Sequence, residues 1–375
     1  MSRINNLHAV RVGAALLVVY YHTGFQFAGL QPFGAFSVPL FFVISGFVMA
    51  MVATEQPSQF MQRRLLRVIP TYWFCTFVIF LLSVRYPLLF HSTRPHVKWL
   101  LESLFFIPFQ KAPGIIMPLV FVGWTLNCEM VLYLFIAIGI RFTGKRPVLF
   151  ASVALVVLMA VCACLASKSP VAFFYSRSTM LSFVLGMGAY TIWKKIETKT
   201  AIALRWYAYG ILLVCGVGLC VLEGLRIAPY LLEDGIFTAR PLLSATGAFL
   251  IVMAVVVLAK SGHDIRSNSL MTIADSTYIM YLTHAYVLLM IVLVSEKFYA
   301  PLSMNRPAGL MLALTCPLVV AVSAHLWLEK PVMSFLKKLL LTPASQPPRQ
   351  KMLLEDADGT GVYQIPATKT IGAYE

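Results

Sequence analysis

The sequence predicts an all-α, polytopic integral membrane protein with about ten transmembrane helices in one bundle. Of its 375 residues, 59% are hydrophobic and only 12% are charged, and the mean hydropathy is +0.80. A soluble domain carries about 25% charged residues, so no soluble core could bury this much apolar surface. Lipid must therefore solvate most of the chain.

Ten apolar segments have about the length that a helix needs to cross the hydrocarbon layer, although two are shorter. They are residues 8–28, 36–54, 69–84, 118–140, 147–166, 177–193, 206–223, 240–259, 272–295 and 307–328. A further apolar stretch, 98–109, is too short to span and is predicted to be an interfacial or re-entrant helix. We expect residues 1–340 to form the transmembrane domain and 341–375, which are polar, to form a disordered cytoplasmic tail.

The net charge of +15 is distributed as expected for a membrane protein. With ten spans and the N-terminus inside, 20 of the 30 lysines and arginines lie on the inner side. This excess predicts that both termini are cytoplasmic and that the protein lies in the cell (inner) membrane as a multi-pass protein. No basic face with interleaved aromatic residues occurs, so we do not expect a nucleic-acid partner. The first apolar segment contains charged residues and no cleavage site, which argues against a cleaved signal peptide.

The seven cysteines are scattered and most lie in apolar segments. They form neither a CxxC pair nor a cluster with histidines, so the sequence predicts no disulfide, no metal site and no permanently bound cofactor.

The first span contains two ionisable residues, Arg11 and His22, eleven positions apart. Eleven steps of 100° place both on one helix face, about 16 Å apart along the axis. An ionisable group at membrane depth normally faces a protein cavity or a water path. The simpler alternatives are that His22 bonds to a neighbouring helix and that Arg11 only marks the inner interface.

The third span begins with a cluster of arginines, Arg63, Arg64 and Arg67. Their i, i+3 and i, i+4 spacing places the guanidinium groups on one side of a helix. Such a cluster suits the phosphate groups of a ligand. The alternative is that the cluster is ordinary, because cytoplasmic helix ends are rich in arginine.

Four further polar positions are of interest: three lie at membrane depth, and Glu329 lies at the inner interface. Glu129 in the fourth span is predicted to lie beside His22 and to orient it, or alternatively to pair with an arginine. His284 in the ninth span is either a site residue or a packing residue, and Glu329 is expected to pair with a basic side chain. Ser45, next to Gly46 in the second span, is expected to allow close helix packing, because no nucleophile elbow surrounds it.

Six segments together resemble the acyltransferase-3 family of bacterial membrane proteins, in the order in which that family has them. The segments are Arg11 with His22, Leu40–Phe47, Arg64 with Arg67 before Pro70, Trp124 with Glu129 and Tyr133, Tyr281–His284, and Glu329–Pro331. The chain is most similar to the short, exopolysaccharide-production (ExoZ-type) branch. The resemblance covers residues 5–335.

The resemblance implies transfer of an acyl group, often acetyl, from cytoplasmic acyl-CoA to a carbohydrate hydroxyl, with His22 as the catalytic residue. Arg11, Arg64 and Arg67 match family positions that are important for function, and we expect them to bind the acyl-CoA phosphates. Glu129 is then the second catalytic candidate, with Arg63, Ser45, Trp124, Tyr133 and His284 as supporting residues.

Several alternatives stay open at this stage. The acceptor is a carbohydrate, free or lipid-linked, the acyl group is acetyl or succinyl, and transfer is direct or proceeds through an acylated residue. The chain works within the lipid bilayer alone or as a homo-oligomer. A secondary transporter and a subunit of a polysaccharide-export machine are the rival functions. The sequence shows no two related halves of the kind common in transporters.

Overall fold

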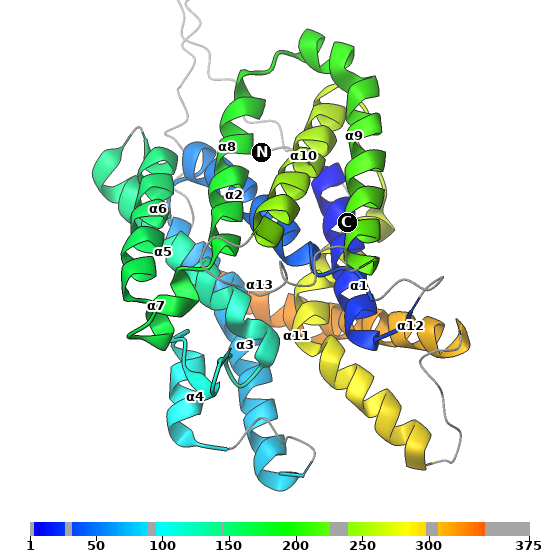
Figure 1. The fold of residues 1–375 in the computed structure, drawn as a ribbon. Helices are drawn as coiled ribbons and strands as arrows, with labels where there is room; N and C mark the ends of the chain where they lie inside the picture. The colour runs from blue at the N-terminus through cyan, green and yellow to red at the C-terminus, as the bar shows by residue number, and fades with distance from the viewer. Residues whose placement is uncertain are drawn as a thin grey trace, which may run out of the picture.

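The computed structural model describes residues 4–26, 32–88, 95–144, 146–225, 239–297 and 307–341. In these ranges the chain is helical nearly throughout (Figure 1). The strands described there are β1 (Gln110–Ala112) and β2 (Ile115–Ile116), which form an antiparallel hairpin. The predicted all-α class is therefore confirmed, and the predicted tail, 341–375, lies outside the described residues apart from Leu341.

Eight helical segments of the described chain are long and apolar enough to cross a membrane. They comprise α2 (Ser37–Glu55), α3 (Phe60–Arg85), α5 (Trp124–Thr143) with the preceding 3₁₀ turn Phe121–Gly123, α6 (Pro147–Leu165), α9 (Thr198–Gly224), α10 (Ala239–Lys260), α11 (Asn268–Lys297) and α12 (Pro307–Ala324) with its continuation to Leu340. The protein is thus a multi-pass membrane protein.

The other two predicted spans are the helices α1 (Asn5–Thr23) and α8 (Leu181–Lys195). Polar side chains lower the hydropathy of α1, and α8 has 15 residues, which is short for a full crossing. Both nevertheless lie inside the bundle: α1 packs against α2, α10, α11 and α12, and α8 packs along α2. Protein neighbours rather than lipid surround much of each helix.

Short elements complete the described chain. The predicted helix at 98–109 is α4 (Val97–Leu104), and α7 (Pro170–Tyr175) precedes the 3₁₀ turn Ser178–Met180. After α12 the chain forms a π-helix, η4 (His325–Glu329), and then α13 (Lys330–Leu340), so that α12 and α13 run across the bundle in Figure 1. Helix α3 begins nine residues before the predicted span, because the arginine cluster belongs to the same helix.

Two glycines bring α2 and α8 into close contact. A Cβ added to Gly46 would lie 2.3 Å from the carbonyl oxygen of Phe183, and one added to Gly186 would lie 2.1 Å from that of Val43. Only glycine allows backbones to approach this closely, as in other membrane helix pairs. The close packing expected at Gly46 is therefore confirmed, and it fixes the position of the neighbouring Ser45.

The N-terminus of α1 is anchored by the loop between α10 and α11. The backbone amides of Asn5 and Asn6 donate to the Asp264 carboxylate at 3.2 and 2.9 Å, and a carboxylate there satisfies free amides and favours the helix dipole. The Asn6 side chain also donates to the carbonyl oxygens of Val255 and His263. This anchoring sets the height and rotation of α1, and hence of Arg11 and His22.

Candidate active site

Five helices bring the predicted charged residues around one pocket, which we call the cationic pocket. Helix α1 contributes Arg11, α2 contributes Ser45, and α3 contributes Arg64 and Arg67. The remaining polar lining comes from α5 and α11: Thr125, Glu129, Tyr133, Thr277, Tyr278 and Tyr281. With three guanidinium groups and one carboxylate, the pocket has an excess of positive charge and suits an anionic ligand.

Both carboxylate oxygens of Glu129 are hydrogen-bonded within the cationic pocket. The Ser45 hydroxyl donates to Oε1 at 2.7 Å, and the Tyr133 hydroxyl, one helical turn further along α5, donates to Oε2 at 3.0 Å. Glu129 also interacts electrostatically with Arg11 and Arg64. The structure therefore places Glu129 with the arginines and not beside His22, which favours the alternative that it pairs with arginine.

The three arginines of the α3 cluster have different surroundings. Arg63 donates to the backbone carbonyls of Gln56 and Ser58 and so fastens the turn between α2 and α3. Arg64 and Arg67 line the cationic pocket, and the buried Nε of Arg64 has no hydrogen-bond partner among the described residues. A buried donor of this kind is costly unless a ligand or water satisfies it. Arg64 thus has a buried donor that is available to an anion in the pocket.

His22 lies in the last turn of α1, and its closest ring neighbour is a second histidine. The centroids of the His22 and His284 rings are 5.1 Å apart. His284 Nδ1 contacts the carbonyl oxygens of Met280 and Tyr281, which only accept, so Nδ1 bears the proton. Its Nε2 is then a free acceptor in the neutral ring, and that atom is buried without a partner in the described chain. His284, expected to be either a site or a packing residue, therefore lies next to His22.

A second cavity, which we call the His22 cavity, adjoins the imidazole. Its lining combines aromatic, hydroxyl and carboxylate side chains: Tyr21, His22, Phe121, Trp124, Thr179, Glu223, Ser244 and Tyr281. The cavity volume is about 300 Å³, at the lower end of the range of small-molecule sites. The imidazole is exposed to this space and not packed in the core.

Glu223, at the end of α9, lines the His22 cavity and was not predicted from the sequence. Its Oε2 accepts a hydrogen bond of 2.7 Å from the backbone amide of Gly34. Gly34 has a φ of +124°, and a Cβ there would lie 2.5 Å from the carbonyl oxygen of Leu17, so glycine is required. The signal that could have revealed Glu223 is a carboxylate directly after the long apolar run 210–222 of α9.

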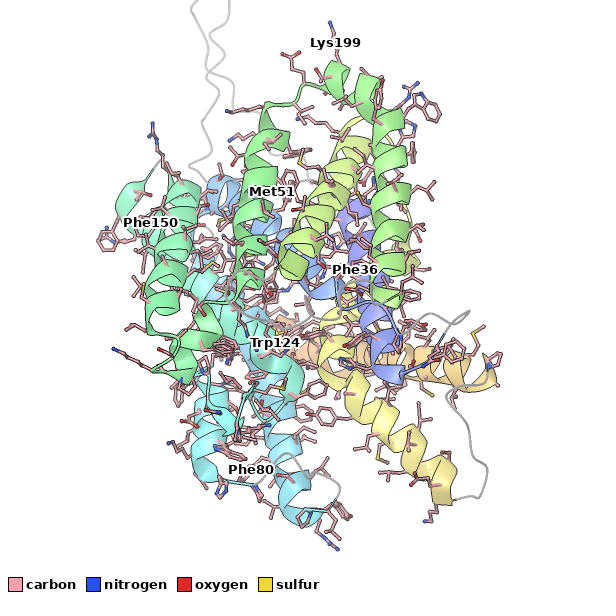
Figure 2. The ribbon with its side chains drawn as sticks, in the orientation of Figure 1. Phe36, Met51, Phe80, Trp124, Phe150 and Lys199 are labelled. Atoms are coloured by element: carbon pink, nitrogen blue, oxygen red, sulfur yellow. The ribbon has the colours of Figure 1, made fainter. Side chains whose placement is uncertain are left out.

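Trp124 is the first residue of α5 and lies near the centre of the bundle (Figure 2). It lines the His22 cavity, and the guanidinium of Arg177 lies 5.7 Å from its ring centroid. This distance is within the range of a cation–π interaction. Arg177 also contacts Phe173 and Phe174 in the same way, and it was not singled out from the sequence. The contact helps to hold Trp124 at the wall of the cavity.

Two side chains, Val38 and Tyr281, line both the cationic pocket and the His22 cavity and form the wall between them. The Tyr281 hydroxyl donates to the carbonyl oxygen of Val122 at 2.9 Å and accepts from Thr125 at 2.9 Å. The Tyr281 ring also lies 6.1 Å from that of His284. The candidate site thus consists of two compartments separated by Val38 and the hydrogen-bonded Tyr281.

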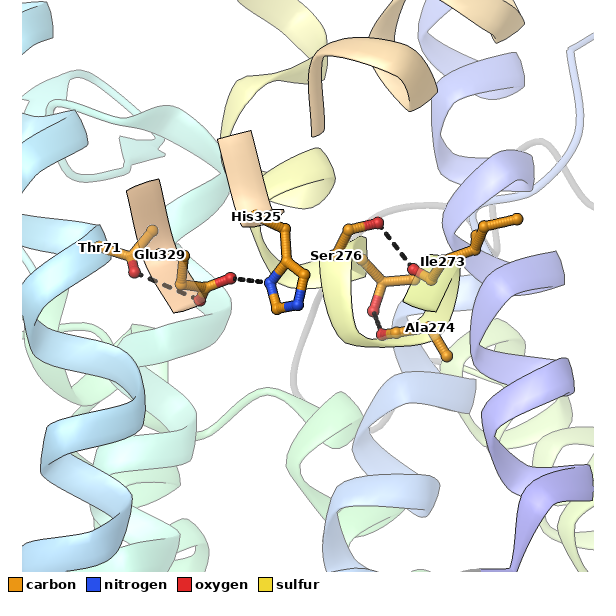
Figure 3. Close-up of polar contacts among 7 residues, drawn as sticks. Thr71, Ile273, Ala274, Ser276, His325 and Glu329 are labelled. Carbon is orange, nitrogen blue, oxygen red and sulfur yellow. Dashed lines mark hydrogen bonds and ion pairs between the residues drawn. The ribbon is translucent and has the colours of Figure 1, made fainter. Parts of the chain in front are cut away.

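A further polar cluster lies on the π-helix η4 (Figure 3). His325 Nδ1 lies 2.6 Å from Glu329 Oε2, and Thr71 on α3 donates to Glu329 Oε1 at 3.4 Å. The basic partner expected for Glu329 is therefore His325. The cluster links the end of α12 to α3, the helix that contains Arg64 and Arg67, and we assign it a structural role.

Comparison with known proteins identifies the family. The family described as "Acyltransferase domain" (Acyl_transf_3) matches residues 4–327. The chain belongs to the acyltransferase-3 family. It is also similar to "Exopolysaccharide production protein ExoZ" of Rhizobium meliloti (strain 1021), with 29% identity over 306 residues, which are 80% of this chain and 90% of that protein. No solved structure matches the chain. The resemblance predicted from the motifs is confirmed, and the protein is a membrane acyltransferase.

Proposed function

We propose that this acyltransferase transfers an acyl group, acetyl in the first instance, from cytoplasmic acyl-CoA to a hydroxyl group of an exported carbohydrate. The observation that carries the proposal is the pair of compartments on either side of Tyr281. One compartment is cationic and the other contains an accessible imidazole. A reaction that joins an anionic donor to a neutral hydroxyl needs both kinds of environment.

The cationic pocket is the proposed acyl-CoA site. Arg11, Arg64 and Arg67 supply guanidinium groups, which match phosphate oxygens in geometry and charge. Residues of α1 line the cationic pocket at Arg11 and the His22 cavity at Val18, Tyr21 and His22. The pantetheine arm would follow this helix and present the thioester at the Tyr281 wall. With both termini in the cytoplasm and the protein in the inner membrane, acyl-CoA enters the cationic pocket from the cell interior.

The His22 cavity is the proposed acceptor site, and His22 the general base. The acceptor oxygen attacks the thioester carbonyl as His22 takes its proton, the carbon–sulfur bond then breaks, and the thiolate of CoA leaves with that proton. The buried Nε2 of His284 can accept a hydrogen bond from His22 and so stabilise the imidazolium. A route through an acylated residue uses the same compartments in two steps.

Exopolysaccharide is the acceptor class that the relative suggests. The protein from Rhizobium meliloti is named for exopolysaccharide production, and the His22 cavity presents Glu223, Ser244 and aromatic rings. Carboxylates and hydroxyls can bond sugar hydroxyls, and aromatic rings can pack against apolar sugar faces.

The test is acyl transfer by membranes that contain the protein, supplied with labelled acetyl-CoA and a carbohydrate acceptor. We expect His22→Ala to lower kcat about 10²–10⁴-fold, the usual contribution of a general base. His96→Ala is the matched control, because His96 lies beside Trp99 at the start of α4, outside both compartments. Undiminished transfer by His22→Ala contradicts the assignment. Solute uptake that depends on an ion gradient and not on CoA would favour a transporter instead.

A further inference from the structure

Helix α2 and the turn before it pass from the His22 cavity into the cationic pocket, and Val38 is the position at which the lining changes. Gly34, Ala35 and Pro39 line the His22 cavity and not the pocket. Further along the helix, the side chains that line the pocket and not the cavity are Phe41, Phe42, Ile44, Ser45, Val48 and Met49. Val38 lines both compartments. An acyl group that moves from the pocket towards His22 therefore passes the Val38 side chain.

The two side chains that the compartments share have little freedom to move. Tyr281 is held at its hydroxyl end, which donates to the carbonyl oxygen of Val122 and accepts from Thr125. Val38 lies in the first turn of α2, and a β-branched side chain in a helix strongly prefers one χ1 rotamer. The room for an acyl group between the compartments is therefore set by a fastened tyrosine and a stiff valine.

We propose that Val38 determines the size of the acyl group that the enzyme transfers and restricts it to acetyl. This inference rests on the proposed function and specifies its donor. The carbonyl carbon of an acetyl group carries one methyl group. Each further methylene of a propionyl or butyryl group needs space that the Val38 methyl groups occupy, because Tyr281 cannot move aside without losing its two hydrogen bonds. A closely fitting apolar site discriminates about 10–200-fold for one methylene.

Charge excludes succinyl in the same direction as size. A succinyl group ends in a carboxylate two methylenes beyond the thioester carbonyl. On the His22 side of the wall the described lining contains the Glu223 carboxylate and neither lysine nor arginine. A second carboxylate there would lack a cationic partner, and an unpaired charge away from water is costly. The acyl end of the donor is therefore required to be both small and neutral.

The experiment measures kcat/KM for acetyl-CoA, propionyl-CoA and butyryl-CoA, with membranes that contain the protein. The acceptor is oligosaccharide released by mild acid from the exopolysaccharide of the producing cells and freed of acyl groups by mild alkali. The wild-type protein should prefer acetyl-CoA to butyryl-CoA at least about tenfold. Val38→Ala, which removes two methyl groups, should lower that ratio at least about fivefold. Val48→Ala is the matched control, because Val48 lies on the same helix and lines only the cationic pocket. It should keep the wild-type ratio, since the CoA part is the same in all three donors.

Equal kcat/KM for acetyl-CoA and butyryl-CoA in the wild-type protein overturns the proposal, and so does a wild-type preference for succinyl-CoA. A Val38→Ala variant that keeps the wild-type ratio overturns it as well. If Val38→Ala is inactive with every donor, Val38→Ile, which adds one methylene, decides: the ratio of acetyl to propionyl transfer should rise, and an unchanged ratio contradicts the role of Val38. Failure of the wild-type protein to transfer from any donor contradicts the proposed function itself, and that outcome is distinct from an altered ratio.

Discussion

The cationic pocket and the His22 cavity differ in how their polar groups are held. In the pocket, both oxygens of Glu129 are hydrogen-bonded, and five helices fix the lining. In the cavity, His22 is held by ring contacts with Tyr21, Phe121 and His284 at 5.1–5.6 Å and is exposed. The polar groups of the pocket are thus held by hydrogen bonds within the protein, whereas the imidazole of the cavity is held by ring contacts alone and stays accessible.

Arg64→Ala is the variant of the cationic pocket for which we expect the largest change in the KM for acyl-CoA. A hydrogen bond to a charged group contributes about 1.5–3 kcal/mol, so loss of a phosphate contact should raise the KM for acyl-CoA about 10–100-fold. The kcat at saturating acyl-CoA should change little, because His22 lies in the other compartment. Steady-state kinetics with varied acyl-CoA measure both constants.

Arg141→Ala is the control for Arg64→Ala. Arg141 lies in the last turn of α5, is exposed, and its guanidinium lies 5.7 Å from the Phe142 ring. The Arg141→Ala variant should leave the KM for acyl-CoA unchanged. An equal KM in the two variants would remove Arg64 from the acyl-CoA site.

The sequence could predict the fold class and the pocket residues, because the physical signals for both are local. Hydropathy identified the membrane helices, and helical spacing placed Arg64 and Arg67 on one side of α3. The sequence could not predict which side chains lie next to His22 and Glu129, because these contacts depend on long-range packing. His284 lies 262 positions from His22 in the chain, and its free Nε2 follows from bonds to carbonyls of α11. For the same reason Glu129 was expected beside His22, whereas the packing of α2 on α5 places it against Ser45.

Glu129→Gln tests whether Glu129 acts in the cationic pocket or on His22. Replacing the charged acceptor of the Ser45 and Tyr133 hydrogen bonds by a neutral amide should cost about 1 kcal/mol. We expect an approximately fivefold change in the KM for acyl-CoA, with the pH profile of kcat unchanged. A shifted pH profile of kcat with an unaltered KM would instead show that Glu129 acts on His22.

Glu102→Gln is the matched control for Glu129→Gln. Glu102 lies on α4 and forms a pair of 3.9 Å with Lys98, away from both compartments. The Glu102→Gln variant should have the wild-type KM for acyl-CoA and the wild-type pH profile of kcat.

The close packing of α8 on α2 supports the pocket, and Gly186→Ala tests it through stability. Gly186→Ala forces a Cβ to within 2.1 Å of the Val43 carbonyl, and such overpacking typically costs about 1–3 kcal/mol. The melting temperature in detergent should fall by a few degrees, and the KM for acyl-CoA should rise because Ser45 moves with α2. Gly188→Ala, two residues along α8, meets nothing within 4 Å and should be neutral or stabilising. Equal melting temperatures for the two variants would show that α2 tolerates displacement.

The π-helix at His325–Glu329 has a consequence for the helix that follows it. A wide turn of this kind contains one residue more than an α-helical turn, and each residue rotates the chain by about 100°. Deleting one residue there would therefore rotate α13 by roughly a quarter of a turn relative to α12. Lys337 and Lys338 would then point in another direction, and so would Phe335 and Leu339, which are exposed apolar residues of the same helix. The extra residue thus sets the direction in which the charged and the apolar edges of this amphipathic helix face.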